Sequence, residues 1–240
     1  MVNTEGNRTV MHENKSLMSS ADFLQRLSSA RLLAIIRGSR ADAAIATALA
    51  LIEEGFQFLE ISLNTDDALR VIQTVAQDCG GAMIGAGTVL SESDVTHARA
   101  AGTSFLVTPA LAPSVAEAVR QGIPVIAGAM TPTEAYSAMQ IGAAAVKLFP
   151  ASSGGPAYLS ALRDPLPTTP FVPVGGIDLS AARQYWAAGA VAVGIGGPLV
   201  KDAASGGDLN ALRERARAFL GAAAKSAAAE ADGSRPAPRP

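Results

Sequence analysis

The sequence contains few cysteines and histidines. Its 240 residues include one cysteine, Cys79, and two histidines, His12 and His97, which lie far apart in the chain. A single cysteine excludes an intrachain disulfide and is typical of proteins from a reducing compartment, so we expect a cytoplasmic protein. Neither histidine has the spacing of a metal-ligand pair, so we expect no histidine-based metal site.

A long apolar run and a strong net charge are also absent from the sequence. No run reaches the roughly 20 apolar residues of a membrane span. The polar start, residues 1–19, lacks the apolar centre of a secretory signal and is expected to be flexible. The formal net charge of -2 gives no reason to expect nucleic acid or an anionic membrane as a partner. Residues 223–240, rich in alanine, proline and charge, are expected to form a disordered tail.

Residues 20–222 show a regular alternation of short apolar runs and segments with helical periodicity. Strict alternation with continuously apolar strands favours a parallel sheet. Eight such units in about 200 residues fit an α/β fold of one domain, the TIM (β/α)8 barrel. A doubly wound open sheet is less favoured, because no glycine fingerprint of a dinucleotide site follows a strand. The expected strands cover residues 32–36, 58–61, 82–84, 105–107, 124–127, 143–149, 171–174 and 190–193.

The apolar run over residues 143–151 has a lysine, Lys147, at its centre. Burying an ammonium group without a partner costs several kcal/mol, so this placement is unusual. Side chains alternate along a strand, so Ala145, Lys147 and Phe149 should face the same way, and Pro150 should end the strand. Lys147 would then lie near the carboxyl end of its strand, where barrels carry their active sites. A lysine that extends to the surface is the alternative on spacing alone.

Glu60 is a second charged residue within an apolar strand, between Leu59 and Ile61. If its face points inward, Glu60 and Lys147 share the barrel interior, and each lowers the cost of burying the other. A buried ion pair that fixes the strand register is the structural alternative, although such pairs contribute little net stability. A buried amine beside a carboxylate suits carbonyl chemistry, in which the amine attacks a ketone and the carboxylate transfers protons.

Polar residues and glycine pairs follow several of the other strands. The pairs Gly175–Gly176 and Gly196–Gly197 follow the last two strands, where barrels often bind phosphate on backbone N–H groups. Arg37 and Thr88 follow the first and third strands and could bind a substrate carboxylate. A surface ion pair is the alternative for Arg37, and a role at a helix start is the alternative for Thr88.

At these residues the sequence resembles a known family, the 2-keto-3-deoxy-6-phosphosugar-acid aldolases. The resemblance covers about residues 32–200, and its most specific motifs are KLFPA at residues 147–151, GAGTVL at 85–90 and EISLNT at 60–65. It implies a class I pyruvate aldolase that works through a Schiff base. It also implies a TIM barrel, a usually trimeric assembly and no metal or other cofactor.

The resemblance also implies roles for individual residues. Lys147 matches the imine-forming lysine and Glu60 the glutamate that transfers protons. Thr88 matches a residue that contacts the pyruvate carboxylate, and Pro109 one that lines the pocket. The phosphate loops match Gly175, Gly176, Gly196 and Gly197, although Gly197 stands where the family often has serine.

Two positions resemble the galactonate-type branch of the family rather than the gluconate-type branch. Gluconate-type enzymes usually carry arginine and threonine where this chain has Asn64 and Val174. Ile36-Arg37-Gly38 also resembles the galactonate branch, in which Arg37 would replace the missing arginine as carboxylate ligand. We therefore expect cleavage of 2-dehydro-3-deoxy-6-phospho-D-galactonate to pyruvate and D-glyceraldehyde 3-phosphate. The alternatives are the gluconate epimer or both epimers, a phosphosugar isomerase on the same barrel, and a non-catalytic sugar-acid sensor.

Overall fold

The computed structural model describes residues 18–232, and in this range eight parallel strands form one sheet. Their order is β7-β6-β5-β4-β3-β2-β1-β8, so neighbours in sequence are neighbours in space except where β1 meets β8. The strands are β1 (Leu32–Ile36), β2 (Phe58–Ser62), β3 (Met83–Gly87), β4 (Phe105–Val107), β5 (Val125–Ala129), β6 (Ala145–Leu148), β7 (Phe171–Pro173) and β8 (Val193–Ile195).

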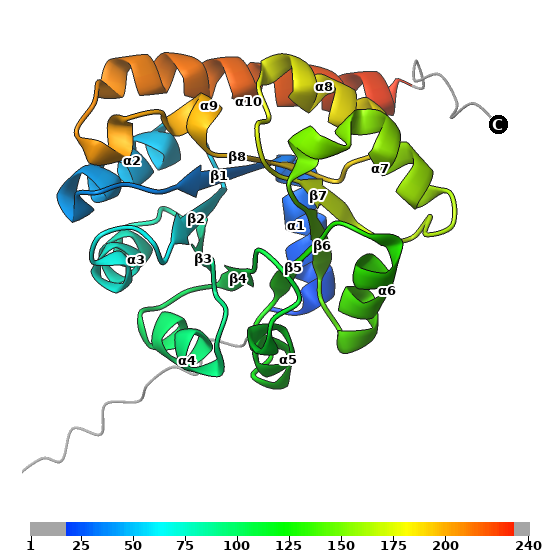
Figure 1. Cartoon of the computed structure of the whole chain (residues 1–240). Coiled ribbons are helices and arrows are strands. Elements are labelled where there is room, and N and C mark those ends of the chain that lie inside the picture. Colours follow the sequence, from blue (N-terminus) through cyan, green and yellow to red (C-terminus); the bar gives the residue numbers. More distant parts are fainter. Residues whose placement is uncertain (1–17, 233–240) are drawn as a thin grey trace, which may run out of the picture.

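The sheet closes on itself between β7 and β8. Val174 and Gly194 form an isolated parallel bridge, and the Val191 N–H donates a hydrogen bond of 3.0 Å to the Phe171 carbonyl. Figure 1 shows the resulting ring of strands with helices around its outside. This arrangement confirms the predicted single-domain TIM barrel, whose carboxyl-terminal strand ends converge on one face.

Several helices begin at a residue whose side chain caps the first turn. Ser91 and Thr131 each form a capping box, with Asp94 and Glu134 respectively. The helices are α1 (Ser20–Ala30), α2 (Ala41–Glu54), α3 (Ala68–Gln77), α4 (Glu92–Ala100), α5 (Pro113–Arg120), α6 (Pro132–Ile141), α7 (Gly155–Arg163), α8 (Leu179–Ala187), α9 (Gly197–Val200) and α10 (Leu209–Ala231). Two short 3₁₀ turns, η1 (Ala151–Ser153) and η2 (Ala203–Ser205), follow β6 and α9.

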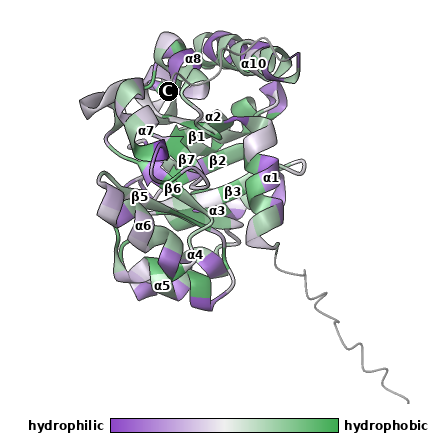
Figure 2. Cartoon of the chain, turned by 90° about the vertical axis from the view of Figure 1, so that its right-hand side faces the viewer, coloured by the Kyte–Doolittle hydropathy of each residue, from purple (hydrophilic) through white to green (hydrophobic). Residues whose placement is uncertain are grey.

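The apolar core has two layers, one inside the barrel and one between strands and helices. Phe23 and Leu27 of α1 belong to the inner layer, so this helix packs against the strands' amino-terminal end of the barrel. The rings of Phe23, Phe58 and Phe105 pack there with centroid separations of 5.4 to 5.8 Å. Figure 2 shows the hydrophobic strands enclosed by helices whose outer faces carry the hydrophilic residues. These side chains fill the barrel at the amino-terminal ends of the strands, so a binding site is expected at the carboxyl-terminal ends.

The structure differs from the sequence-based expectation in several element bounds, among them β3, which extends to Gly87 rather than to residue 84. The last strand covers Val193–Ile195 rather than residues 190–193, because Leu32 to Ala34 of β1 pair with Val193 to Ile195. Helix α10 runs to Ala231, so residues 223–231 are helical rather than disordered. Alanine favours helix, and the Arg31 guanidinium pairs with the Glu230 carboxylate at 2.7 Å. The remaining tail residues, 233–240, and the predicted flexible residues 1–17 lie outside the described range.

No helix within residues 18–232 has the length and apolar character of a membrane span.

Candidate active site

Lys147 and Glu60 both point into the barrel. Ala145 belongs to the inner core layer, whereas Val146 and Leu148 belong to the outer one, which places Lys147 on the inner face of β6. Glu60 follows the same rule on β2, because Phe58 is in the inner layer. Lys147 is 6% exposed and Glu60 is 1% exposed. Both side chains therefore lie on the inner face of the barrel, which is the condition under which the sequence places them in one interior.

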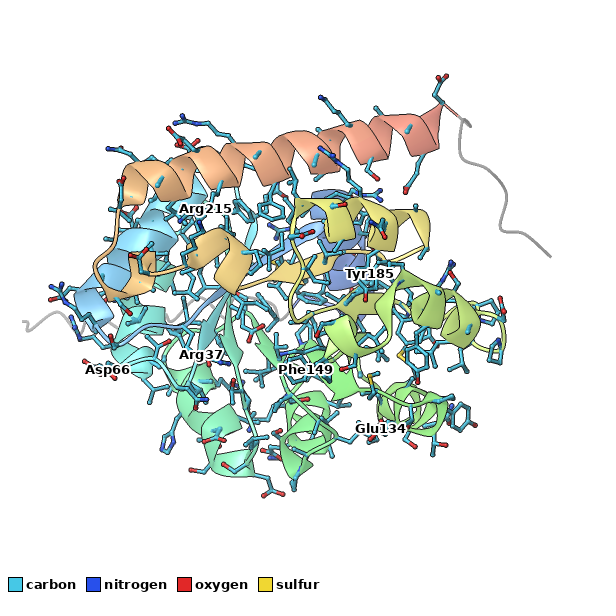
Figure 3. The ribbon with its side chains drawn as sticks, turned by 45° about the horizontal axis from the view of Figure 1, so that its top comes forward. Arg37, Asp66, Glu134, Phe149, Tyr185 and Arg215 are labelled. Atoms are coloured by element: carbon cyan, nitrogen blue, oxygen red, sulfur yellow. The ribbon has the colours of Figure 1, made fainter. Side chains whose placement is uncertain are left out.

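A cavity of about 390 Å³ lies at the carboxyl-terminal ends of the strands and contains both groups. Figure 3 labels Arg37 and Phe149, which lie near the middle of the ring of strands. The lining residues come from seven of the eight strand ends. They are Ile35, Arg37, Glu60, Thr88, Pro109, Lys147, Phe149, Val174, Gly175, Gly176, Gly196, Gly197, Val200 and Lys201.

Asn64 is the one predicted site residue that does not line this cavity. The chain turns after β2, and the Asn64 N–H donates a hydrogen bond of 3.4 Å to Ser62 Oγ while its side chain is exposed. Its placement follows from this turn, which carries residue 64 away from the barrel centre. The alternation of side chains along β2 could not predict the direction of Asn64, because the strand ends at Ser62.

The surroundings of Glu60 favour a carboxyl group that can exchange a proton. Burial raises the pKa of Glu60 above its ordinary value, while the positive charges of Lys147 and Arg37 partly oppose this rise. Its Oε2 atom is buried and has no hydrogen-bond partner among the described residues. Gly87 makes room for the carboxyl group, since a Cβ at this position would lie 1.8 Å from Glu60 Oε1. Glu60 therefore keeps an oxygen available for a ligand.

Lys147 is held between two strands and beneath an aromatic ring. It pairs with Gly128 of β5 and Val172 of β7, and its Nζ lies 5.1 Å from the centroid of the Phe149 ring. Lys147 forms no salt bridge with any residue in the range 18–232. The amine therefore remains available to a ligand, and its charge lies close enough to Glu60 to oppose the rise in the pKa of that carboxyl group.

Ser62 connects Arg37 and Thr88, and the sequence analysis did not select it as a site residue. Its hydroxyl lies 3.0 Å from Thr88 Oγ1 and accepts a hydrogen bond of 3.4 Å from Arg37 Nε. Thr88 has a φ of 61°, which is uncommon for a β-branched residue and needs support from its surroundings. Ser62 shares the inward face of Glu60, so its position on β2 was the available signal. This group places a cation and hydroxyls beside the cavity.

The loop that carries Pro109 is fixed by its neighbours on β4 and β5. Thr108 Oγ1 donates to the Ala110 carbonyl at 2.7 Å and accepts from the Gly128 N–H at 3.0 Å. A Cβ at Gly128 would lie 2.2 Å from the Pro109 carbonyl carbon, so only glycine allows this close approach. Pro109 thus forms a rigid apolar part of the cavity wall.

Lys201, which the sequence analysis did not select, lines the cavity together with the two predicted glycine pairs. Gly175 and Gly176 have φ values of 109° and 73°, which glycine adopts without strain. Lys201, in contrast, has a φ of 48° as a non-glycine residue. No pattern in the local sequence predicts that Lys201 lines the cavity. Its placement follows from the four-residue helix α9, after which the Lys201 N–H donates a hydrogen bond to the Gly197 carbonyl.

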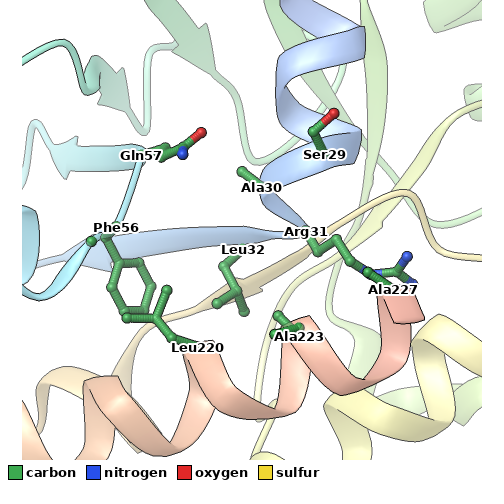
Figure 4. Close-up of a pocket in the computed structure, with 11 residues that line it drawn as sticks. Ser29, Ala30, Arg31, Leu32, Phe56, Gln57, Leu220, Ala223 and Ala227 are labelled. Atoms are coloured by element: carbon green, nitrogen blue, oxygen red, sulfur yellow. The ribbon is translucent and has the colours of Figure 1, made fainter. Parts of the chain in front are cut away.

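A second cavity of about 190 Å³ lies at the opposite end of the barrel, between α1, β1 and α10 (Figure 4). Its charged group, Arg31, is already paired with Glu230 at 2.7 Å and lies 5.6 Å from the centroid of the Trp186 ring. The other lining residues are mostly apolar. This end of a barrel is usually concerned with stability, and the contacts here fit that role.

Metal-binding residues do not gather at either end. Within residues 18–232, no group of three or more histidine, cysteine, aspartate or glutamate side chains could hold a metal ion. The ionisable and hydroxyl side chains that line the main cavity are those of Arg37, Glu60, Thr88, Lys147 and Lys201.

Comparison with known proteins identifies the family. The family model for KDPG and KHG aldolase matches residues 24–214, which include every described strand and the cavity residues Glu60 and Lys147. The chain belongs to the KDPG and KHG aldolase family. It is therefore an aldolase, that is, a carbon–carbon lyase.

Relatives within this aldolase family bear two kinds of name. A Rhizobium meliloti (strain 1021) protein named "Probable 2-dehydro-3-deoxy-6-phosphogalactonate aldolase" is 39% identical over 80% of this chain and 90% of its own. A "2-dehydro-3-deoxy-phosphogluconate aldolase" from Treponema pallidum (strain Nichols) is 36% identical over 68% of this chain and 79% of its own. The solved structure titled "Native KDPGal structure" is 34% identical, with a TM-score of 0.77, and covers 82% of this chain and 96% of its own. Relatives with galactonate and with gluconate names thus both match this chain over more than two thirds of their own length.

Proposed function

We propose that this aldolase cleaves 2-dehydro-3-deoxy-6-phospho-D-galactonate to pyruvate and D-glyceraldehyde 3-phosphate through a Schiff base on Lys147. The observation that supports this most is the placement of Lys147 and Glu60 in one buried cavity at the carboxyl end of the barrel. A desolvated amine is a nucleophile for ketones, and a carboxyl group with a free oxygen can transfer the protons that each step requires.

The reaction uses these two groups in sequence. The neutral Lys147 amine adds to the C2 carbonyl, and loss of water from the carbinolamine gives a protonated imine. Glu60, ionised, removes the proton of the C4 hydroxyl while the C3–C4 bond breaks and its electron pair moves into the imine, which becomes an enamine. Glyceraldehyde 3-phosphate leaves. Glu60 then returns its proton to C3, and water releases pyruvate from Lys147.

The other lining residues would hold the two anionic ends of the substrate. Arg37 and Thr88, connected through Ser62, would bind the carboxylate next to the reacting carbonyl. Pro109 and Phe149 provide an apolar wall that limits water around the imine. The phosphate would bind to backbone N–H groups of the pairs Gly175–Gly176 and Gly196–Gly197.

The choice of the galactonate epimer is supported by Val174. Of the two branch-specific positions, Val174 lines the cavity and is 5% exposed, whereas Asn64 is outside it. An apolar side chain cannot form a hydrogen bond with a substrate hydroxyl directed at it, a difference worth about 1 to 3 kcal/mol. We expect a higher kcat/KM for the galactonate epimer, with some activity on the gluconate epimer.

Parallel turnover of the two epimers tests this choice. Val174→Thr should shift the ratio of the two kcat/KM values toward the gluconate epimer, because threonine adds a hydroxyl at nearly constant volume. Val191→Thr, which lies outside the cavity, serves as the matched control. An unchanged ratio in Val174→Thr would show that residue 174 does not set the preference. A parent protein that favours the gluconate epimer would overturn the choice of epimer and leave the aldolase assignment intact.

A homotrimer in the cytoplasm is the assembly and location that we propose for this aldolase. Support comes from the motif resemblance, the single cysteine, and apolar side chains exposed around the barrel, among them Leu90 (46%) and Tyr136 (56%). Light scattering on the purified full chain tests the assembly. A mass of one or two chains would contradict the trimer.

A further inference from the structure

Lys201 is a cation at the glycine-rich part of the cavity that the reaction described above does not use. It lines the cavity with Gly175, Gly176, Gly196 and Gly197, and its own N–H donates a hydrogen bond of 2.9 Å to the Gly197 carbonyl. Its side chain is exposed, and it forms no salt bridge with any residue described between positions 18 and 232. Its charge is therefore not neutralised by a neighbouring carboxylate.

The backbone around Lys201 is fixed in an unusual conformation. Lys201 has φ 48° and ψ -121°, a region that non-glycine residues seldom occupy and that the surrounding structure must enforce. The Asp202 carbonyl accepts hydrogen bonds from the Ser205 N–H at 2.8 Å and the Gly207 N–H at 3.0 Å. The segment after Lys201 is thus a tight, internally bonded turn.

This turn is also attached to the strand end that carries Arg37. Ser39 donates its N–H to Ser205 Oγ at 3.2 Å, and the two hydroxyls lie 3.1 Å apart. A Cβ at Gly38 would lie 2.0 Å from the Ala204 carbonyl oxygen, so glycine is needed for this close packing. The position of Lys201 at the cavity is therefore set by contacts on both sides of it.

The cavity needs a cation at this place if a phosphate binds to the glycine pairs. Backbone N–H groups offer partial charges, whereas a phosphate monoester carries close to two negative charges at pH 7. The other lysine of the cavity, Lys147, is committed to the imine, and Arg37 is bonded to Ser62 on the carboxylate side. Lys201 is the remaining cationic side chain among the described lining residues, and an ammonium binds phosphate well as a point charge.

We propose that Lys201 positions the substrate by pairing with its phosphate group, and so sets the preference for phosphorylated over unphosphorylated sugar acids. This inference rests on the proposed function, because it takes the aldol substrate to be phosphorylated. Lys201 acts at the end of the substrate remote from the broken bond. Its removal should raise KM much more than it lowers kcat.

The experiment compares cleavage of 2-dehydro-3-deoxy-6-phosphogalactonate with that of its unphosphorylated counterpart in three variants of the full chain. Lys201→Met removes the charge at similar length, Lys201→Arg keeps it, and Lys225→Met removes a lysine on α10 that is outside the cavity. For Lys201→Met we expect the ratio of the two kcat/KM values to fall about 10- to 100-fold, the effect of losing one charge-assisted contact. Lys201→Arg should recover most of the ratio, and Lys225→Met should match the parent protein.

Inorganic phosphate provides a second readout. It should inhibit the parent protein competitively, and its inhibition constant should rise in Lys201→Met by a factor similar to the fall in the substrate ratio. An unchanged ratio in Lys201→Met would overturn the inference. The ratio would stay unchanged even if both substrates lost activity equally, because the lysine would then act on the carboxylate or on the fold.

Failure of the proposed function is recognised separately. Reduction of the parent protein with borohydride in the presence of pyruvate should attach pyruvate to Lys147, and this step involves no phosphate. Absence of that adduct would overturn the Schiff-base function itself. An adduct together with an unchanged substrate ratio in Lys201→Met would overturn only the role of Lys201.

Discussion

At the scale of single residues, the environment of Glu60 decides what its carboxyl group can do. The group is buried, so desolvation raises its pKa, whereas Lys147 and Arg37 act in the opposite direction. An acid whose pKa is moved toward neutral pH can both release and accept a proton during turnover. The free Oε2 atom gives the substrate access to that proton.

Glu60→Gln should therefore slow turnover strongly. Glutamine keeps the shape of the side chain but cannot accept a proton, and general acid–base groups typically contribute roughly 10²- to 10⁴-fold to the rate. In the parent protein, kcat/KM should fall as the pH drops through the pKa of Glu60, which lies above the ordinary value of 4.5, because cleavage needs the ionised form. Steady-state kinetics across pH measure both effects.

Glu92→Gln, on the exposed start of α4, is the matched control and should behave like the parent protein. A Glu60→Gln rate within threefold of the parent rate would show that Glu60 has only a structural role.

At the scale of elements, the strand β3 is shaped to receive the Glu60 side chain. Gly87 pairs with Ser62 in register, and a Cβ there would lie 1.8 Å from Glu60 Oε1 and 2.4 Å from its Cδ. The Glu60 carboxyl group can occupy its position only because β3 has no side chain at this point. The glycine is thus part of the site although it has no functional group.

Gly87→Ala should displace Glu60 and reduce turnover about as much as Glu60→Gln does. The cost of overpacking should lower the free energy of unfolding by about 1 to 3 kcal/mol. Gly221→Ala in α10, where a Cβ meets nothing within 4 Å, is the control and should raise stability by up to about 1 kcal/mol. Urea denaturation and kinetics measure the two effects. Parent-like turnover in Gly87→Ala would contradict the account of how β3 positions Glu60.

Most elements follow from the sequence because their signals are local. The strands Leu32–Ile36 and Phe105–Val107 have the predicted bounds, since a continuous apolar run defines each of them. The last strand does not, because the apolar run over residues 190–195 is longer than the part that pairs with β1. Strand register depends on contacts with a partner more than 150 residues away, which no local pattern contains.

The same reason explains which site residues were predictable. Lys147 and Glu60 are charged residues in apolar strands, so the anomaly is visible in the sequence itself. Ser62 shares the face of Glu60 on β2, but its contacts with Arg37 and Thr88 are tertiary, and Lys201 owes its position to the turn attached to Ser39. Asn64 was predicted from the motif resemblance, and the turn after β2 directs it away from the cavity.

At the scale of the whole molecule, α10 connects the end of the chain to the start of the barrel. Figure 1 shows this helix extending across the outside of the ring of strands. The Arg31 side chain, 9% exposed, is held between the Glu230 carboxylate and the Trp186 ring. The two ends of the barrel thus have separate tasks, with stabilising contacts at one and the candidate active site at the other.

Glu230→Ala should lower the free energy of unfolding by about 1 to 3 kcal/mol, because Arg31 loses its charged partner while remaining largely buried. The kcat of the folded variant should match that of the parent protein, since the pair lies at the end of the barrel opposite the cavity. Glu214→Ala, on the exposed face of α10, controls for the loss of a helical glutamate. Equal stability of the two variants would show that the Arg31 pair does not hold α10 in place.

Pyruvate trapping tests the central claim most directly. Incubation of the full chain with pyruvate and borohydride, followed by digestion and mass spectrometry, should add one reduced pyruvate to the peptide that contains Lys147. Lys147→Ala should fold, show no turnover and acquire no label at this peptide, whereas Lys225→Ala should be labelled like the parent protein. Label on a different residue, or none on the parent protein, would contradict the assignment of Lys147 as the Schiff-base lysine.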